Sequence, residues 1–291
     1  MLEAQPGILA PLPPFSRYIT LRARAGAPRR TLRRLTDLRP GPELVVGLGA
    51  ALLRAVDAEI PGMREAPALA GKGVTIPSTP ADLWLWLRGD DPGALLHRGR
   101  GLIKLLAEDL AVDELSEGFL HNGGRDLSGY EDGTENPTGD EAVAAALVDG
   151  DQPGLSGSSF VAVQRWLHSL DHLAAMTQDE RDESIGRRLA DNEEFDAPPS
   201  AHVKRSAQES FDPEAFLVRR SMPWTEGARE GLHFIAFGRS FAAFEAILKR
   251  MIGVDDGIID ALFRFTRPIT GNYFWGPPLA DGLLDLSLLK L

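Results

Sequence analysis

One glycine-rich loop contains the residue types most suited to binding or acid–base chemistry. Residues 129–137 read Gly-Tyr-Glu-Asp-Gly-Thr-Glu-Asn-Pro, and glycines around an acidic pair, followed by Asn-Pro, are typical of a tight turn. Gly133 has no Cβ, so its backbone can lie close against a flat or bulky group. The competing interpretation is an acidic surface turn, with Asp132 exposed to solvent.

Histidine imidazoles are the obvious candidates for metal ligands in this chain, because the chain contains no cysteine. His202 follows two prolines in a predicted loop, where a lone histidine is more often simply solvated. His233 lies in an apolar predicted strand and is either a core histidine or the main rival of His202 as a ligand. His168 and His172 have metal-ligand spacing, but His168 ends a predicted strand and no third ligand is near, so we interpret both as structural.

Two arginine-containing motifs could bind anionic groups. Arg187 stands in Ile-Gly-Arg-Arg, and its guanidinium could bind a carboxylate through two parallel hydrogen bonds. It could equally stabilise a helix C-terminus. Arg219 and Ser221 share one face of a predicted strand, and Arg220 lies on the other. Alternation does not reveal which face is buried.

Composition limits the possible functions. The 291 residues are 43% hydrophobic and carry a formal net charge of -11, which argues against binding nucleic acid because phosphate contacts need a basic surface. Without cysteine, disulfides, thiolate metal sites and covalent haem attachment are excluded. No window reaches the length of a membrane span and no secretion signal is evident. We therefore expect a cytoplasmic protein.

Hydrophobic periodicity predicts a similar series of elements in each half of the chain. The first half is predicted to contain strands at 17–22 and 81–87, helices at 42–56 and 91–106, and an extended segment at 111–119. The second half is predicted to contain strands at 159–166, 216–220 and 232–237 and helices at 179–189 and 241–251. This order favours an α+β fold, with helices packed on antiparallel sheets. Two similar halves, residues 1–150 and 151–291, would form a duplicated ferredoxin-like arrangement, although the identity between them is too weak to show a repeat.

Several short motifs together resemble the dye-decolorising peroxidases. They are Gly-Ile-Leu-Ala-Pro at 7–11, the Gly-x-x-Asp-Gly-Thr-x-Asn-Pro loop at 129–137, Gln-Arg-Trp at 164–166, Ile-Gly-Arg at 185–187, Ala-His-Val at 201–203, Arg-x-Ser-Met-Pro at 219–223 and Thr-Gly-Asn-Tyr-Phe-Trp at 270–275. The resemblance covers nearly the whole chain and is greatest to the cytoplasmic bacterial branch, type B. Glu131 departs from the aliphatic residue usual before the aspartate, and this extra charge leaves the tuning of Asp132 open.

The resemblance implies a non-covalently bound haem b. His202 would be the iron ligand, and Arg187 would pair with a haem propionate. Gly133 and Thr134 would contact the cofactor.

The resemblance also implies a reaction with hydrogen peroxide. Asp132 would carry the proton needed to break the O–O bond, and Arg219, with Ser221 beside it, would stabilise the charge on the leaving oxygen. Dyes, phenols or other aromatic donors would then give up single electrons, at the haem edge or through a surface aromatic residue. Tyr273 and Trp275 are candidates for that route, although buried packing is the better interpretation of both. An alternative function is haem binding or haem-iron handling with incidental peroxidase activity.

The leucine-rich tail after the double proline at 277–278 is a possible docking segment. It could contact a neighbouring subunit of a homo-oligomer or, with weaker support, an encapsulating shell protein.

Overall fold

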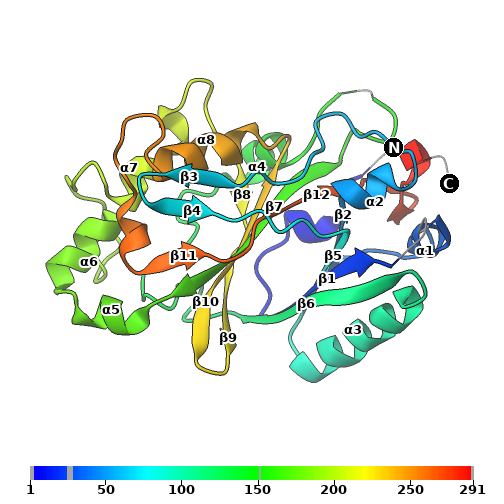
Figure 1. The fold of residues 1–291 in the computed structure, drawn as a ribbon, viewed down its shortest axis with the longest axis horizontal. Coiled ribbons are helices and arrows are strands. Elements are labelled where there is room, and N and C mark those ends of the chain that lie inside the picture. Colours follow the sequence, from blue (N-terminus) through cyan, green and yellow to red (C-terminus); the bar gives the residue numbers. More distant parts are fainter. Residues whose placement is uncertain (1–2, 25–28, 151, 290–291) are drawn as a thin grey trace.

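A single antiparallel sheet dominates the fold and helices pack on its outside (Figure 1). The computed structural model describes residues 3–24, 29–150 and 152–289. The sheet has ten strands in the order β11-β7-β12-β2-β5-β1-β6-β9-β10-β8, with an additional pairing between β7 and β10. The predicted combination of an antiparallel sheet with helices is confirmed.

The pairing of β7 with β10 closes most of the strands into a barrel. The ring runs through β7 (Ser159–His168), β12 (Asn272–Gly276), β2 (Leu44–Gly49), β5 (Leu83–Gly89), β1 (Phe15–Ala23), β6 (Leu110–Phe119), β9 (Met222–Glu226) and β10 (Arg229–Gly238). Gly118 and Trp224 form the pair that joins β6 to β9. The short strands β8 (Val218–Arg219) and β11 (Thr266–Pro268) extend β10 and β7, and two small hairpins are formed by β3 (Leu69–Gly71) with β4 (Val74–Ile76) and β13 (Leu279–Ala280) with β14 (Leu283–Leu284).

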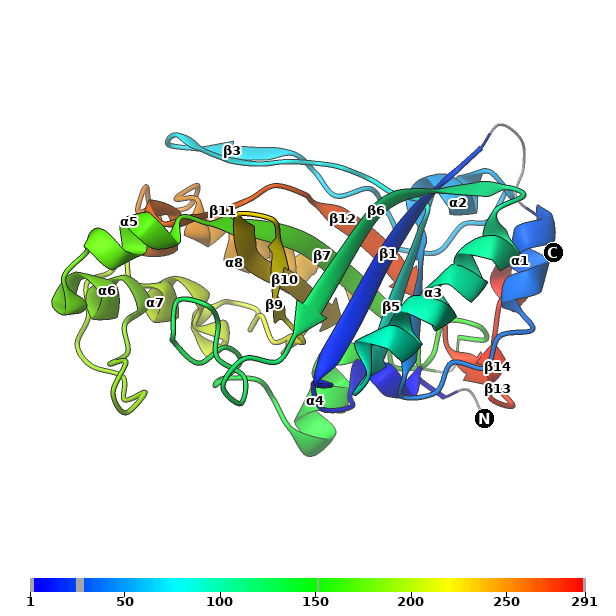
Figure 2. The ribbon, with the colours of Figure 1, turned by 90° about the horizontal axis from the view of Figure 1, so that it is seen from below.

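Most of the helices lie on the outer face of the barrel (Figure 2), whereas the helix at 139–146 packs Ala142, Ala145 and Ala146 against the inner cluster. They are α1 (Arg29–Leu35), α2 (Ala50–Arg54), α3 (Pro92–Leu106), α4 (Gly139–Ala146), α5 (Leu170–Ala175), α6 (Gln178–Ile185), α7 (His202–Ser206) and α8 (Ala242–Met251), with 3-10 turns η1 (Pro6–Ile8), η2 (Gln208–Ser210), η3 (Ala261–Arg264) and η4 (Ser287–Leu289). Helix α3 begins as predicted, because Asp91 caps the Ala94 amide and Pro92 occupies the first turn. Within the described residues, no helix is both long and apolar enough to cross a bilayer.

Alternation along the strands separates two apolar clusters. Trp84 and Trp86 of β5 belong to the cluster inside the barrel, together with Phe274. Leu83 and Leu85 point the other way, into the larger cluster under the helices. Both faces of the strand are therefore buried, which explains why its sequence is a continuous apolar run.

The predicted helix at 42–56 is wrong over its first half. Residues 44–49 form the strand β2, and only 50–54 are helical. Every residue of β2 is buried, so apolar residues recur at helical as well as strand spacing, and periodicity does not separate the two. Gly47 and Gly49 favour the strand, because a Cβ at Gly49 would lie 1.9 Å from the Ala81 carbonyl oxygen.

Two further predicted elements are shorter than expected. The predicted strand at 216–220 is reduced to β8. Helix α6 ends at Ile185 because Gly186 adopts φ 93°, the left-handed conformation of a helix cap.

The leucine-rich tail packs on its own chain. Leu279, Leu284, Leu286 and Leu289 are buried in the larger core cluster, and Leu279 forms a bridge with Glu3. Residues 290–291 of the tail lie outside the described part of the chain. Docking of this segment on another protein stays a prediction.

Candidate functional site

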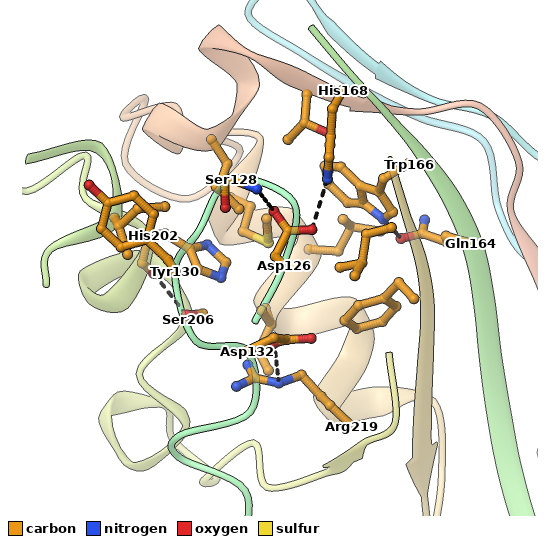
Figure 3. Close-up of a pocket in the computed structure, with 18 of the residues that line it drawn as sticks. Asp126, Ser128, Tyr130, Asp132, Gln164, Trp166, His168, His202, Ser206 and Arg219 are labelled. Carbon is orange, nitrogen blue, oxygen red and sulfur yellow. Dashed lines mark hydrogen bonds and ion pairs between the residues drawn. The ribbon is translucent and has the colours of Figure 1, made fainter. Parts of the chain in front are cut away.

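A cavity on the outside of the barrel brings together three of the predicted site residues, His202, Asp132 and Arg219 (Figure 3). It is partly open to solvent. Leu232 and Phe234 of β10 and Phe244 and Leu248 of α8 supply apolar walls. The polar groups come from the loop before α4, the end of β7, α7 and β8.

His202 lines this cavity and is oriented by a buried carboxylate. Its Nδ1 lies 2.8 Å from Oδ2 of Asp260, whose side chain is fully buried. The other Asp260 oxygen accepts the Leu262 amide at 2.9 Å. The hydrogen bond between His202 and Asp260 fixes the proton on Nδ1 of His202 and makes Nε2 the nitrogen that can bind a metal. Asp260 was not predicted from the sequence.

Asp132 and Arg219 line another part of the same cavity, where their side chains face each other. Their Oδ1 and Nε atoms are 3.9 Å apart, and both side chains are largely buried. Among the described residues, Arg219 Nε has no hydrogen-bond partner. An anion in the cavity would supply the acceptor that this donor lacks.

Three other predicted residues lie beside the cavity and do not line it. Gly133 adopts φ +79°, which allows the tight turn after Asp132. The Thr134 hydroxyl accepts a hydrogen bond from Asn192 at 3.2 Å. Ser221 is buried, and its hydroxyl has no partner among the described residues.

Arg187 is occupied by other protein groups. Its guanidinium donates to Glu135 at 2.5 Å and to the Asn192 carbonyl at 3.0 Å, and it lies 3.4 Å from Glu194. It does not line the cavity. Arg220, next to Arg219 in the sequence, donates to the carbonyl of Leu9 at 2.9 Å and so holds the amino-terminal arm.

Strand alternation separates His233 from the cavity. Leu232 and Phe234 face the cavity, so His233 points into the barrel. There it stacks on Tyr18 with ring centroids 3.6 Å apart. Burial, and secondarily the charge of Arg165, hold its pKa well below 6.5. Of the two rival histidines, only His202 reaches the cavity.

A second His–Asp pair lines the cavity and was missed. His168 ends β7, as predicted, but its Nε2 lies 2.9 Å from Oδ1 of Asp126 and its Nδ1 lies 2.7 Å from the Thr266 hydroxyl. His172 is exposed on α5. The described residues contain no group of three or more potential metal ligands.

Tyr130 connects the loop to α6. Its hydroxyl donates to Asp182 at 2.5 Å, and its ring borders the cavity beside His202 (Figure 3). Burial and the Asp182 carboxylate raise the pKa of Tyr130. The phenol is therefore neutral and acts as a donor that holds the loop against the helix.

The aromatic residues suggested as surface electron carriers are buried. Tyr273 stacks on Phe241 at 3.8 Å, and Trp275 is fully buried. Both side chains pack in the core, as the simpler interpretation predicted.

Known proteins resemble this chain in sequence and in fold. The family model described as "Dyp-type peroxidase, C-terminal" matches residues 123–281. The dye-decolorizing peroxidase of Mycolicibacterium paratuberculosis is 32% identical over 216 residues, which are 72% of this chain and 61% of the relative. For the similar enzyme of Mycobacterium tuberculosis the matched share is 65%, so the chain spans less than two thirds of the length of these curated relatives.

Solved structures extend the similarity to the whole fold. A candidate Dyp-type peroxidase of Shewanella oneidensis has a TM-score of 0.90 and 26% identity, with 100% of this chain and 99% of the other covered. A DypB variant of Rhodococcus jostii RHA1 in complex with heme has a TM-score of 0.85 and 26% identity, with 92% and 94% covered. The chain belongs to the Dyp-type peroxidase family.

Proposed function

We propose that this protein is a haem b peroxidase of the type B branch. It reduces hydrogen peroxide and oxidises dyes, phenols or other aromatic donors in one-electron steps. The observation that carries the proposal is one cavity lined by His202, with Asp260 behind it, and by the Asp132–Arg219 pair.

The residues of the cavity fit a haem. An imidazole with a buried carboxylate on its far nitrogen is a suitable iron ligand, and apolar walls suit a porphyrin. When bound, the haem supplies iron redox chemistry. His202 would hold the iron. Arg187, Gly133 and Thr134 stay predictions as cofactor contacts, and Arg187 would have to exchange Glu135 for a propionate.

Asp132 and Arg219 would activate peroxide. The carboxylate of Asp132 would accept a proton from one peroxide oxygen and return it to the other, which leaves as water when the O–O bond breaks. Arg219 offers a buried cation whose Nε donor is unpaired within the described residues, and it stabilises negative charge on the leaving oxygen. The apolar wall around them limits competing water and strengthens these interactions.

Haem binding and turnover test the proposal. The purified chain supplied with haem should show a Soret band and oxidise an aromatic donor with peroxide. His202→Ala should lose or strongly shift that band, because no cysteine can replace the imidazole. His233→Ala is the matched control and should keep it. A band lost in His233→Ala and kept in His202→Ala would contradict the ligand assignment, and a Soret band without turnover would favour haem handling.

We also infer that the barrel is built from two ferredoxin-like halves, residues 1–150 and 151–291. The order of the strands supports this inference. In the first half the sheet order is β2-β5-β1-β6, and in the second half it is β9-β10-β7-β12. In both halves the second of these four strands along the sequence comes first in the sheet, followed by the third, the first and the fourth. Each half also places a helix, α3 or α8, before its last strand. Expression of the two halves as separate chains that reassemble would test the division.

Self-association and localisation stay predictions. Exposed Leu96 and Leu105 on α3 and Val112 and Leu115 on β6 offer apolar surface for a homo-oligomer. Light scattering of the purified chain tests this. A cytoplasmic location and an encapsulating shell partner are further expectations from the family resemblance.

A further inference from the structure

One buried glutamine lies just after the helix that begins with His202. Gln208 is the first residue of η2, close behind the end of α7 at Ser206, and the residue is only 3% exposed. A side-chain amide has an NH2 group that donates and an oxygen that accepts, and a buried amide is expected to use both. The partners of Gln208 therefore show which segments of the chain it joins.

The two ends of the Gln208 side chain bind two other segments. Nε2 donates to the Glu135 carbonyl at 2.9 Å, and Oε1 accepts the Leu217 amide at 2.9 Å. These partners also settle the orientation of the side-chain amide, because a carbonyl must face the NH2 group and an N–H must face the oxygen. The backbone carbonyl of Gln208 accepts the Ala215 amide at 2.9 Å, which holds the residue itself in place.

Both partners of the side chain lie close to the proposed peroxide-activating residues. The Glu135 carbonyl belongs to the loop of Asp132, and the next residue of that loop, Asn136, forms hydrogen bonds with the Arg219 backbone. Leu217 lines the cavity, as Arg219 does. The glutamine therefore contacts both the loop and the extended segment that carry the Asp132–Arg219 pair.

Helix α7 is fixed on its other side by a buried arginine. Arg205 donates to both carboxylate oxygens of Asp256, at 2.7 and 2.8 Å, and to the Arg250 carbonyl at 2.6 Å. His202 is held by Asp260. The helix is therefore anchored to α8 and to the segment after it, and the glutamine that follows the helix adds a link to the loop and to residues 217–219.

We propose that Gln208 is a positioning residue that sets the separation between His202 and the Asp132–Arg219 pair. Gln208 does not line the cavity, so it touches no reacting group and acts through its two hydrogen bonds. The catalytic part of this proposal rests on the proposed function, since those three residues are the ones expected to bind iron and to activate peroxide. A displacement of about 1 Å in such groups can lower a reaction rate by about 100-fold.

Gln208→Leu removes the proposed link with little change in side-chain size. Leucine has no polar atom in its side chain, so the Leu217 amide and the Glu135 carbonyl both lose their partner. Glu209→Leu is the matched control, because Glu209 is the neighbouring residue and is exposed.

Amide hydrogen exchange on the cofactor-free chain tests the coupling. In Gln208→Leu the Leu217 amide loses its own acceptor, so its protection should fall about 10- to 100-fold. The Arg219 amide keeps its acceptor, Asn136, and should nevertheless lose protection because the loop is no longer held. A purely local hydrogen bond would change the Leu217 amide alone. Glu209→Leu should match the native chain at both amides.

Stopped-flow kinetics of the haem-loaded protein test the consequence for the reaction. Gln208→Leu should react with peroxide about 10- to 100-fold more slowly than the native protein. Its Soret band and its KM for the aromatic donor should stay native, because His202 and the apolar walls of the cavity are retained. Glu209→Leu should again match the native protein.

Three results would overturn the proposal. Native protection of the Arg219 amide in Gln208→Leu would show that the segments are not coupled. A native peroxide rate constant despite lost protection would show that the coupling does not serve the reaction, and loss of protection throughout β7 would show a general structural role. If the native chain binds no haem, the proposed function fails, and hydrogen exchange on the cofactor-free chain still decides the coupling.

Discussion

The side-chain amide of Asn136 forms hydrogen bonds with both the backbone N–H and the backbone carbonyl of Arg219. Oδ1 of Asn136 accepts the Arg219 amide at 2.8 Å, and Nδ2 donates to the Arg219 carbonyl at 3.1 Å. The asparagine belongs to the loop of Asp132, so the loop and β8 are fixed relative to each other. The two proposed peroxide-activating side chains are therefore positioned by one shared contact.

Asn136→Ala should uncouple the two segments. Loss of two largely buried hydrogen bonds should lower the free energy of unfolding by about 1–3 kcal/mol. Asn136→Asp keeps the acceptor but places a second oxygen beside the Arg219 carbonyl, so it should also be destabilised. Urea unfolding of the cofactor-free chain measures both, and an Asn136→Ala variant as stable as the native chain would refute the coupling.

Gly133→Ala should be more harmful than Gly139→Ala. Both glycines adopt positive φ, +79° and +53°, so alanine is strained at each position by about 1–2 kcal/mol. A Cβ at Gly133 would also lie 2.6 Å from Nδ2 of Asn136, whereas none of the described residues lies within 4 Å of one at Gly139. The difference in unfolding free energy between the two variants isolates the displaced Asn136; equal losses would show that the contact relaxes freely.

Arg219→Leu should slow the reaction of the haem-loaded protein with peroxide more than Asp132→Ala does. Removal of a fixed charge-stabilising donor typically costs about 10²–10³-fold, and removal of a proton-transfer group about 10²–10⁴-fold, so magnitude alone does not decide. The Asn136 contact and the pairing of Arg219 with Ala236 hold the arginine backbone rigidly, which favours preorganisation. Stopped-flow rate constants decide the order, provided that both variants retain haem, and a larger loss for Asp132→Ala would reverse it.

His233→Phe should flatten the acid dependence of stability. The folded pKa of His233 lies well below 6.5 because of burial, so at acidic pH the unfolded chain binds a proton that the folded chain does not. The stability associated with neutral His233 is complete above about pH 6.5 and falls by about 1.4 kcal/mol per pH unit below it, until the folded pKa is reached. Phenylalanine keeps the stack on Tyr18 and removes this term. Urea unfolding at about pH 7 and about pH 5 should show a smaller loss in the variant.

Sequence patterns predicted elements whose local signals agree with their packing. The α3 helix has a capping aspartate, a proline in its first turn and one apolar face, and all three point to the same boundary. Strand β2 lacks such agreement, since both its faces are buried and its apolar residues fit two periodicities. Closure of the barrel was not predicted, because the β7–β10 pairing depends on contacts between distant segments.

The candidate site was likewise predicted only in part from the sequence. His202, Asp132 and Arg219 stand in motifs that can be recognised locally, and all three line the cavity. The carboxylates that pair with the histidines of the cavity cannot be recognised from a local motif. Asp260 is 58 positions from His202, and Asp126 is 42 positions from His168. His168 was interpreted as a strand end, which is correct for its backbone and incomplete for its side chain.

The joint between β6 and β9 has a consequence for the solubility of the protein. β6 pairs with β1 along its length, but its other side meets β9 at Gly118 alone. A long strand with unpaired amides and carbonyls is a template for aggregation with other chains. Asp113, Glu114 and Glu117 lie along β6 and pair with Arg22, Arg165 and Arg17, and charged side chains on an edge strand disfavour its pairing with another chain. Replacing these carboxylates by neutral residues would remove the ion pairs and should raise edge-to-edge aggregation.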